Sequence, residues 1–549
     1  MFQKGFLWGC ASSAYQIEGG AREGGRGESI WDRFCREEGR ILNGDTGDMA
    51  CDFFHRYKED IALMKQMGIQ AYRFSLSWPR ILPEGTGQVN PEGIAFYNAV
   101  INELLANGIE PYITLYHWDY PQALQDRGGW LNPESVRWFA EYAAVVADAF
   151  SDRVSNFITL NEPQCFTGLA HLHTEHAPGI KLPTKDLFQL VHNVLKAHGA
   201  AVIALRQHAR QPIRVGYAPT CGMVYPPEPT PENIEACRKY LFTCPDDLSN
   251  WTWNVPWFSD PVFLGRYPED GLKKYAPYLP EITQEDMALI SQPLDFMGEN
   301  IYNGIMIEAD ENGEPRYVDR KPGYPTTGNH WPVTPECFYY GLKFLYERYK
   351  TPIYVTENGV CSKDVISADG RVHDPQRIDF LNRYILAMKR VIDDGADIRG
   401  YFQWTLTDNF EWSCGYRDKF GLVYVDFATQ RRYLKDSAFW FAKVISTQGK
   451  CLQPDKTPLF LREEEGDYIV CEGPRTGARY RSDTFRFLGR FEDGLITVVV
   501  NKSWLMKVER GYGRVDSISV RPGDILLLPE NYGNVTLSGD MTVSVEEKL

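Results

Sequence analysis

The segment from residue 71 to residue 117 decides the fold, and its three parts read AYRFSLSW (71–78), PEGIAFYNAVINELLAN (91–107) and PYITLYH (111–117). The first and third parts are short apolar runs, whereas the middle part carries apolar residues at helical spacing. Asn90 before Pro91 is typical of a helix start, and Gly108 is typical of a helix end. The segment therefore predicts two parallel strands joined by a crossover helix.

The same unit recurs along the chain. The pattern predicts eight strands, at residues 6–11, 71–78, 111–117, 156–160, 214–218, 295–302, 352–356 and 398–406. Amphipathic stretches lie between them, at residues 53–67, 91–107, 133–150, 187–208, 338–349 and 375–394. Eight such units can close into a (β/α)8 TIM barrel, an α/β fold. An open doubly wound sheet is the alternative, but no GxGxxG loop follows the first strand.

Two further stretches differ from this unit. Residues 221–275 are long and carry Trp251, Trp253 and Trp257, which predicts an insertion over the top of the barrel. After residue 447, apolar and polar residues alternate, at 468–471, 496–500, 517–520, 525–528 and 543–545. We therefore predict two domains, a barrel over 1–447 and a small sandwich-like all-β domain over 448–549.

Composition limits the partners of the chain. Its 549 residues hold 58 Lys and Arg against 73 Asp and Glu, and the net charge of −15 argues against nucleic acid and anionic membranes. The first residues lack a signal-peptide pattern, and no run of 18 apolar residues occurs. The 12 Cys form no CxxC pair. We expect a cytoplasmic protein with reduced thiols and no membrane partner. Homo-oligomer formation is compatible with this composition.

Two glutamates stand where chemistry is expected. Glu162 follows the fourth predicted strand and Glu357 follows the seventh, and the carboxyl ends of barrel strands form the active-site face. A structural carboxylate paired with an arginine is the alternative for either one. Two facing carboxyl groups suit glycoside hydrolysis, with retention or inversion set by their separation. Polar and aromatic residues that could bind a sugar stand at other predicted strand ends: Gln16, His117, Trp118, Asn161, Tyr302, Trp404, Glu411 and Trp412.

Residues 1–447 resemble glycoside hydrolase family 1, the β-glucosidase family. The matching motifs occur in order along the whole segment: Phe6-Leu-Trp-Gly-Cys-Ala-Ser-Ser-Ala-Tyr-Gln-Ile-Glu18, Tyr72-Arg-Phe-Ser-Leu-Ser-Trp-Pro-Arg-Ile81, Thr159-Leu-Asn-Glu-Pro163, His176-Ala-Pro-Gly179, Tyr354-Val-Thr-Glu-Asn-Gly359, Asp408-Asn-Phe-Glu-Trp412 and Phe420-Gly-Leu-Val-Tyr-Val-Asp426. The C-terminal part of about 100 residues lies outside the resemblance, and we expect it to have a structural or assembly role. Carbohydrate binding through Trp504 and Tyr512 is the alternative.

The resemblance implies a retaining, exo-acting β-glucosidase that releases terminal β-D-glucosyl residues without a metal or organic cofactor. Glu357 then matches the nucleophile and Glu162 the acid/base. Arg73, Tyr302 and Asn161 match residues that support this pair. The glycone-binding positions implied are Gln16, His117, Asn161, Trp404, Glu411, Trp412 and Phe420. A carboxylate at Glu411 suits neutral hydroxyls and disfavours a 6-phosphate.

Departures from the family pattern gather on the aglycone side. Trp331 matches an aglycone-side tryptophan, whereas Gln164 and His171 stand where the family commonly has other residues, so we expect all three at the rim. Side activities on β-galactosides and β-fucosides fit the same site. A transglycosylase using the same two glutamates, and more remotely a non-catalytic sugar-binding protein, are the alternatives. His171, His173 and His176 could instead gather on a metal.

Overall fold

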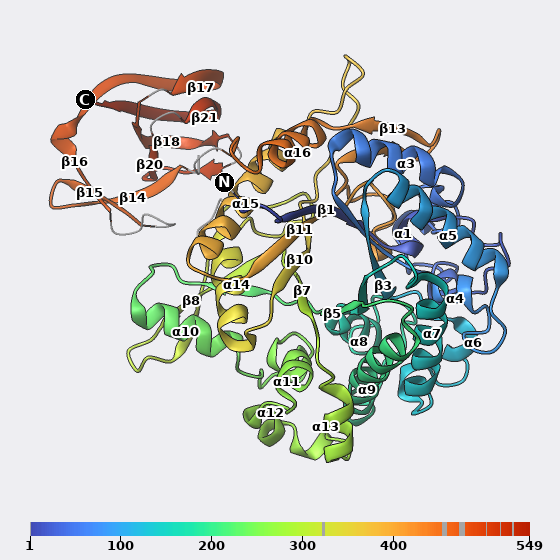
Figure 1. Cartoon of the computed structure of the whole chain (residues 1–549). Helices are drawn as coiled ribbons and strands as arrows, with labels where there is room; N and C mark the ends of the chain where they lie inside the picture. Colours follow the sequence, from blue (N-terminus) through green and yellow to red (C-terminus); the bar gives the residue numbers. More distant parts are fainter. Residues whose placement is uncertain are drawn as a thin grey trace.

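The computed structural model describes residues 2–320, 324–452, 458–471, 478–500, 502–516, 518–529 and 532–549. Its main body is a closed barrel of eight parallel strands in the order β1-β11-β10-β7-β5-β4-β3-β2 (Figure 1). Strand β1 pairs with both β2 and β11, which closes the ring. The strands are β1 (Leu7–Ser12), β2 (Ala71–Ser75), β3 (Glu110–Tyr116), β4 (Asn156–Asn161), β5 (Arg214–Ala218), β7 (Phe296–Asn300), β10 (Ile353–Asn358) and β11 (Ile398–Trp404). All eight predicted strands and the predicted TIM barrel are confirmed.

The predicted helices surround the barrel. They are α3 (Phe53–Met67), α5 (Pro91–Ala106), α7 (Ser135–Phe150), α9 (Thr184–His208), α14 (Pro335–Tyr349) and α15 (Pro375–Asp393), and α16 (Asp436–Thr447) follows the last barrel strand. Helix α7 begins two residues later than predicted, because Asn132 accepts backbone hydrogen bonds from Glu134 and Ser135 in a turn that precedes it. The remaining elements around the strand ends are α1 (Ala14–Ile17), α2 (Ile30–Phe34), α4 (Trp78–Ile81), α6 (Gln122–Gln125), α8 (Pro163–His171), β12 (Val423–Asp426) and β13 (Arg431–Leu434).

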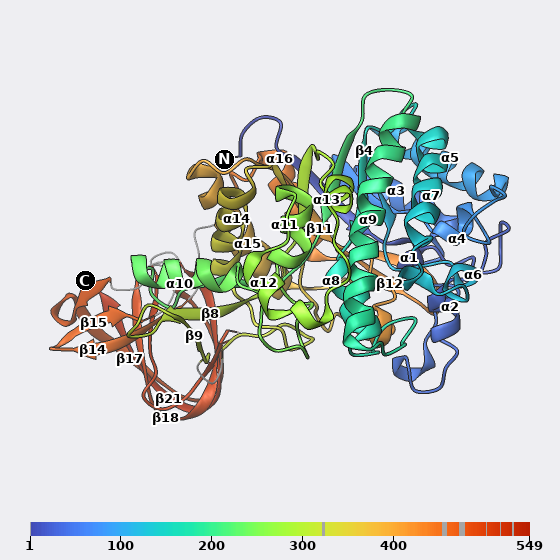
Figure 2. The ribbon, with the colours of Figure 1, turned by 90° about the horizontal axis from the view of Figure 1, so that it is seen from below.

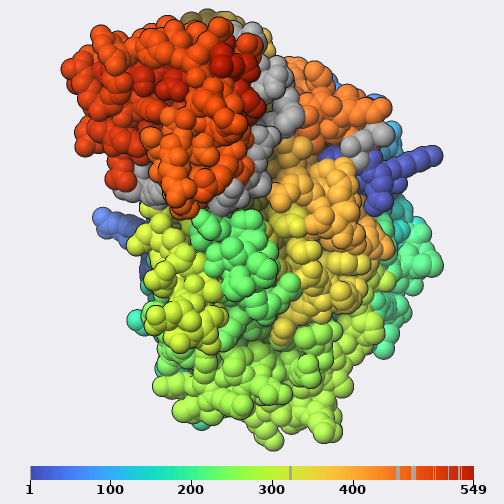
Figure 3. Space-filling view, turned by 90° about the vertical axis from the view of Figure 1, so that its left-hand side faces the viewer, coloured from blue at the N-terminus to red at the C-terminus, as the bar shows by residue number. Residues whose placement is uncertain are grey.

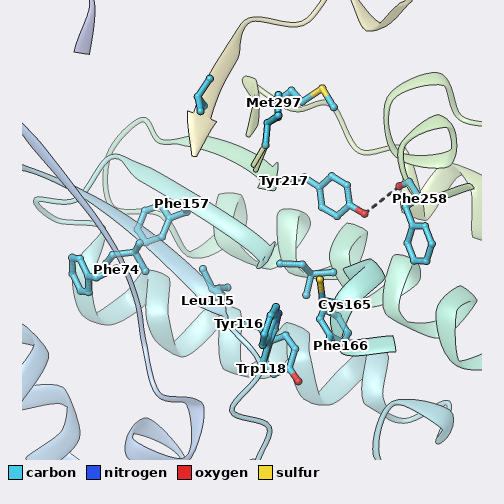
Figure 4. Packing of buried hydrophobic residues seen from close by; sticks show 14 of the residues in the cluster. Phe74, Leu115, Tyr116, Trp118, Phe157, Cys165, Phe166, Tyr217, Phe258 and Met297 are labelled. Carbon is cyan, nitrogen blue, oxygen red and sulfur yellow. Dashed lines mark hydrogen bonds between the residues drawn. The ribbon is translucent and has the colours of Figure 1, made fainter. Parts of the chain in front are cut away.

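Alternate residues of each barrel strand face two different cores. Outward-facing side chains such as Phe157, Tyr217 and Met297 pack against the helix layer, where the Tyr217 hydroxyl donates to the carbonyl of Phe258 at 3.1 Å (Figure 4). Inward-facing side chains, among them Tyr112, Ile158, Phe296 and Phe402, fill the barrel itself. The lower part of the barrel is therefore packed solid, and its carboxyl end is left for a site.

The insertion predicted after β5 is present. It comprises β6 (Met223–Tyr225), α10 (Pro231–Leu241), α11 (Pro256–Leu264), α12 (Glu269–Lys274) and α13 (Gln284–Ile290), and β6 joins a small sheet with β8 (Gly304–Ala309) and β9 (Pro315–Val318). Two of its tryptophans belong to the core, and the Trp251 ring stacks 3.8 Å from that of Phe188. Trp253 is only partly buried and reaches the cavity described below.

The C-terminal region is all-β, as predicted. Its strands form one antiparallel sheet in the order β16-β15-β14-β20-β18-β21-β17, and β19 pairs with β18. They are β14 (Leu459–Glu464), β15 (Asp467–Val470), β16 (Arg479–Arg481), β17 (Phe485–Val500), β18 (Trp504–Val515), β19 (Ile518–Val520), β20 (Ile525–Leu528) and β21 (Gly533–Lys548). Separate apolar clusters cover its two faces, one with Met506 and Leu526 and the other with Leu505 and Leu527. Ser517, the first residue of one predicted strand, lies outside the described residues.

The C-terminal sheet of strands β14 to β21 forms a lobe at one side of the barrel (Figure 3), beside α10, β8 and β9 (Figure 2). A small cavity of about 120 Å³ lies between the two parts, lined by Met306 and Tyr324 from the barrel side and by Phe460 and Ile518 from the sheet. Trp504 is half-buried in the sheet's core and Tyr512 is 72% exposed, eight residues further along the same strand. These two aromatics therefore do not form one sugar-binding platform.

Eight of the 12 cysteines are buried. In the part of the chain that the structure describes, no helix has the length and apolar character needed to cross a membrane.

Candidate active site

The carboxyl ends of the barrel strands open into a cavity of about 910 Å³. Ten of the candidate site residues from the sequence line it: His117, Trp118, Glu162, Tyr302, Trp331, Glu357, Trp404, Glu411, Trp412 and Phe420. Gln16, Arg73 and Asn161 are buried just behind the cavity wall. Each is hydrogen-bonded to a residue that lines the cavity, Gln16 to Glu411, Arg73 to Glu357 and Asn161 to His117. Residues as far apart in the sequence as Gln16 and Phe420 therefore meet at one site.

Glu357, on β10, is held by two donors. Arg73 on β2 donates from Nη1 to Glu357 Oε1 at 2.7 Å, and the Tyr302 hydroxyl donates to Oε2 at 2.7 Å. The side chain is only 3% exposed, so burial raises the pKa of Glu357, while the Arg73 cation and the Tyr302 hydroxyl oppose that rise. Both carboxylate oxygens are thereby fixed in orientation.

Glu162 sits where β4 turns into helix α8. Its backbone adopts a left-handed conformation, with φ 47° and ψ 66°, and Pro163 begins the helix. This sharp turn directs the carboxyl group into the cavity at the end of a rigid strand. Burial and the nearby Glu357 raise the pKa of Glu162 to about 7. At neutral pH a large fraction of Glu162 is therefore protonated, and it can donate a proton.

Asn300 links the two glutamates, although the sequence analysis did not single it out. It ends β7 and is the register partner of Glu357 on β10. Its Nδ2 donates to Glu162 Oε1 at 2.8 Å and to Asn161 Oδ1 at 3.0 Å, and its Oδ1 accepts from Thr356 Oγ1 at 2.7 Å. The signal that could have found it is its place at the end of a barrel strand, two residues before Tyr302.

Among the residues that the structure describes, two buried polar atoms of the deep wall have no hydrogen-bond partner. Gln16 Nε2 donates to the Phe410 carbonyl at 2.8 Å and to Glu411 Oε2 at 3.4 Å, whereas Glu411 Oε1 makes no hydrogen bond. His117 Nε2 lies 3.0 Å from the donor Asn161 Nδ2, so it accepts, and the proton resides on Nδ1, which has no partner. A buried acceptor and a buried donor thus face the cavity together, as a ligand rich in hydroxyl groups requires.

Aromatic rings form the rest of the inner wall and the mouth. The ring of Trp404 lies 5.6 Å from that of His117 at an interplanar angle of 25°, and Trp412 lies 6.0 Å from it at 24°. At the mouth Trp331 is 39% exposed, with its ring 5.4 Å from Tyr302 and 6.2 Å from Phe420. The rings of the inner wall suit the C–H faces of a sugar, and the rings at the mouth suit an apolar group attached to it.

Two expected rim residues lie elsewhere. Gln164 is completely buried with its Oε1 accepting from the Thr220 amide, and the His171 Nδ1 faces the Ile180 carbonyl, so neither lines the cavity. The reason is helical phase: residues three and seven positions after Glu162 share its face, and these are Cys165 and Leu169. The expectation that Gln164 and His171 face the aglycone is therefore corrected in favour of Cys165 and Leu169.

The alternative of a histidine metal site finds no support in the arrangement. His171 is turned toward Ile180, and the His176 ring packs 5.3 Å from both Trp31 and Trp118. Among the residues that the structure describes, no group of three or more His, Cys, Asp or Glu side chains could hold a metal ion.

A buried ionic network anchors the loop that carries Glu411. Lys435 Nζ donates to Asp364 at 2.5 Å and to Asp408 at 2.7 Å, and all three side chains are completely buried. Asp408 also accepts from the Gly421 amide at 2.9 Å. The position of Glu411, three residues after Asp408, therefore depends on charges outside the cavity.

A (β/α)8 barrel with two buried glutamates at the ends of β4 and β10 has the architecture of a glycoside hydrolase. The model of the family described as Glycosyl hydrolase family 1 matches residues 1–450, and the chain belongs to that family. It is therefore a glycoside hydrolase, and the family resemblance seen in the sequence is confirmed.

Several characterised relatives are similar over the same segment. Beta-glucosidase A of Thermotoga maritima is 44% identical over 450 residues, covering 82% of this chain and 98% of that protein. The bifunctional beta-D-glucosidase/beta-D-fucosidase of Bifidobacterium breve is 39% identical, covering 81% and 98%. The solved structure of the Thermotoga maritima beta-glucosidase in complex with glucoimidazole superposes with a TM-score of 0.75 at 44% identity, over 82% of this chain and 99% of that one.

Proposed function

We propose that the protein is a retaining, exo-acting β-glucosidase in which Glu357 is the nucleophile and Glu162 the acid/base. The observation that carries the assignment is the contrast between their surroundings. Glu357 is held by the Arg73 cation and the Tyr302 hydroxyl, whereas burial and Glu357 itself raise the pKa of Glu162 to about 7. One carboxyl is thus prepared to attack and the other to donate a proton. The relatives named above are β-glucosidases, which supports the proposed activity.

The reaction proceeds in two displacements. Glu357 attacks the anomeric carbon while the bond to the aglycone oxygen breaks, and that oxygen receives the proton of Glu162. In the resulting ester Glu357 has lost its charge, so the pKa of Glu162 falls and the residue becomes a base. Glu162 then takes a proton from water, whose oxygen attacks the anomeric carbon and releases Glu357.

The glycone is assigned to the deep wall. Glu411 Oε1 accepts and His117 Nδ1 donates to sugar hydroxyls, Gln16 and Asn161 position these two groups, and Trp404 provides a ring face. An acceptor at Glu411 tolerates either orientation of a 4-hydroxyl, which allows side activity on β-galactosides and β-fucosides. The same carboxyl disfavours a 6-phosphate.

The aglycone is assigned to the mouth of the cavity, whose lining includes Trp331, Phe420, Cys165 and Leu169. These surfaces are apolar, so an aromatic or alkyl aglycone gains contact there. Small-molecule β-glucosides and short oligosaccharides are the substrates proposed.

The experiment that tests the assignment is glutamate-to-glutamine replacement. Glu357→Gln should abolish hydrolysis of an aryl β-glucoside, and Glu162→Gln should slow it by roughly 10²–10⁴-fold. Glu175→Gln, at an exposed carboxylate of the same cavity, is the matched control and should retain activity. Undiminished activity of Glu357→Gln contradicts the proposal.

The stereochemistry is tested separately. Proton NMR of the first product should show the β-anomer of glucose before mutarotation, and release of the α-anomer would exclude retention. Added alcohol acceptors measure how much of the ester is transferred to an acceptor, and a dominant transfer product would identify a transglycosylase with the same two glutamates.

A further inference from the structure

A short hairpin carries Trp331 to the mouth of the catalytic cavity. In this segment, residues 325–333 and called the Trp331 hairpin below, the Val333 amide donates to the Pro325 carbonyl at 2.9 Å, and the Thr327 amide donates to the Trp331 carbonyl at 2.8 Å. Only two residues of chain, roughly 7 Å when extended, lead from Val333 at the base to Trp331. A displacement of the base therefore reaches the indole ring over a short, hydrogen-bonded path.

The base of the Trp331 hairpin lies beside the C-terminal sheet. The cavity of about 120 Å³ between the barrel and that sheet is lined by Pro325 and Val333 of the hairpin and by Leu459, Phe460 and Ile518 of the sheet. Leu459 and Ile518 are buried, and Phe460 is half-buried. The base of the hairpin therefore shares one small and largely apolar cavity with the C-terminal sheet.

Helix α15 connects the same two parts of the molecule. The Tyr384 hydroxyl accepts from the Thr334 amide at 2.9 Å, directly after the hairpin, and donates to the Tyr302 carbonyl at 3.0 Å. The preceding residue, Arg383, lines the cavity shared with the sheet. Burial raises the pKa of Tyr532, just before β21, and the Arg383 cation opposes that rise, so the Tyr532 hydroxyl lies within electrostatic reach of α15. The C-terminal region therefore adjoins both the base of the hairpin and the helix that holds its end.

We propose that the C-terminal sheet is a specificity element for the aglycone, in which Phe460 and Ile518 are positioning residues that hold Trp331 at the mouth through the base of its hairpin. The inference rests on the proposed function, because it concerns the aglycone of the same site. Glu162 and Glu357 stand at the ends of barrel strands. Loss of support from the sheet should therefore weaken the binding of a bulky aglycone and leave the chemistry at the glycone intact.

The ratio of kcat/KM for hexyl β-D-glucoside to kcat/KM for methyl β-D-glucoside tests the inference with the full chain. Both substrates release a simple alkyl alcohol, so the ratio isolates the binding of the longer apolar chain. The variant Phe460→Ala/Ile518→Ala should lower the ratio by roughly 4–14-fold, as expected when one or two methylene groups lose their contact. Phe460→Ala alone, at the half-buried residue, should lower it in smaller measure.

Leu537→Ala is the matched control. Leu537 and Ile518 are both 2% exposed and belong to the same apolar cluster of the sheet, but Leu537 lies outside the cavity lining. Its replacement weakens the core of the sheet without touching the surface that faces the hairpin, so the ratio should stay unchanged.

A double-mutant cycle with Trp331 separates positioning from general destabilisation. Trp331→Ala should itself lower the ratio, and adding Phe460→Ala/Ile518→Ala to it should lower the ratio no further. An unchanged ratio in both Phe460→Ala and the paired variant, equal losses on the two substrates, or additive losses in the Trp331→Ala background would each overturn the inference while leaving the proposed function in place. A wild-type protein that hydrolyses neither substrate would refute the proposed function and this inference with it.

Discussion

The hydrogen bond from Asn300 to Glu162 offers a quantitative test of the acid/base assignment. Asn300 Nδ2 lies 2.8 Å from Glu162 Oε1 and stabilises the ionised form of that carboxyl, so it lowers the pKa of Glu162 against the effect of burial. Asn300→Ala removes the donor. A hydrogen bond to a charged group contributes about 1.5 kcal/mol or more, which corresponds to roughly one pH unit. The pKa of Glu162 should therefore rise from about 7 to roughly 8.

The assay is the pH dependence of kcat/KM for an aryl β-glucoside whose leaving group needs acid assistance. The basic limb reports the ionisation of the proton donor in the free enzyme, so it should move upward by roughly one unit in Asn300→Ala. Met297→Leu, a volume-conserving change on the same strand that faces the helix layer, should leave the limb where it is. A basic limb that stays in place or moves to lower pH in Asn300→Ala would refute the role of this hydrogen bond.

Three further changes have defined outcomes. Arg73→Met leaves the buried Glu357 without its cation, so kcat/KM should fall by about 100-fold or more and its acidic limb should move to higher pH in a pH–rate profile. Lys435→Met removes the cation that contacts the buried Asp408, whereas Asp364 keeps its ion pair with Arg377 at 2.7 Å, and the free energy of unfolding measured in urea should fall by about 3–5 kcal/mol. Glu299 is buried, its Oε2 has no hydrogen-bond partner among the described residues, and burial raises its pKa well above the usual range. Above pH 4.5 Glu299 ionises in the unfolded chain but stays protonated in the folded one, and this difference favours unfolding increasingly as the pH rises. Glu299→Leu should therefore stabilise the protein by about 1–3 kcal/mol. Thermal unfolding should show a larger stabilisation at pH 8 than at pH 5.

The barrel was predictable because its local signals agree. Each strand is a short apolar run and each helix repeats apolar residues at helical spacing, so the predicted and observed elements coincide within a few residues. Helices α3, α5 and α15 are followed by Gly68, Gly108 and Gly395, whose φ values are 73°, 74° and 98°. Glycine adopts such positive φ values without steric cost. The start of α7 was missed because the turn at Asn132 uses the same residue types as a helix cap.

The candidate site was predictable as a set of residues but only partly as a geometry. Position at a strand end identifies Glu162 and Glu357, whereas Asn300 falls inside the predicted strand 295–302 and becomes a strand end only in the structure. Its contacts also depend on the register between β7 and β10. Gln164 and His171 were placed at the rim from their departure from the family pattern. Helical spacing counted from Glu162 predicts instead that both side chains point away from the cavity.

The charge balance of the site explains which state of the substrate it favours. Glu162, Glu357 and Glu411 line one cavity, and burial raises the pKa of Glu162 and Glu411, with a further rise from the charge of Glu357 on both and of Asp418 on Glu411. The negative charge of Glu357 opposes an anionic ligand and interacts weakly with a neutral glucoside. The transition state of glycoside hydrolysis resembles an oxocarbenium ion, whose positive charge is absent in the ground state. The cavity therefore stabilises the transition state more than the bound substrate, and that difference is what lowers the barrier.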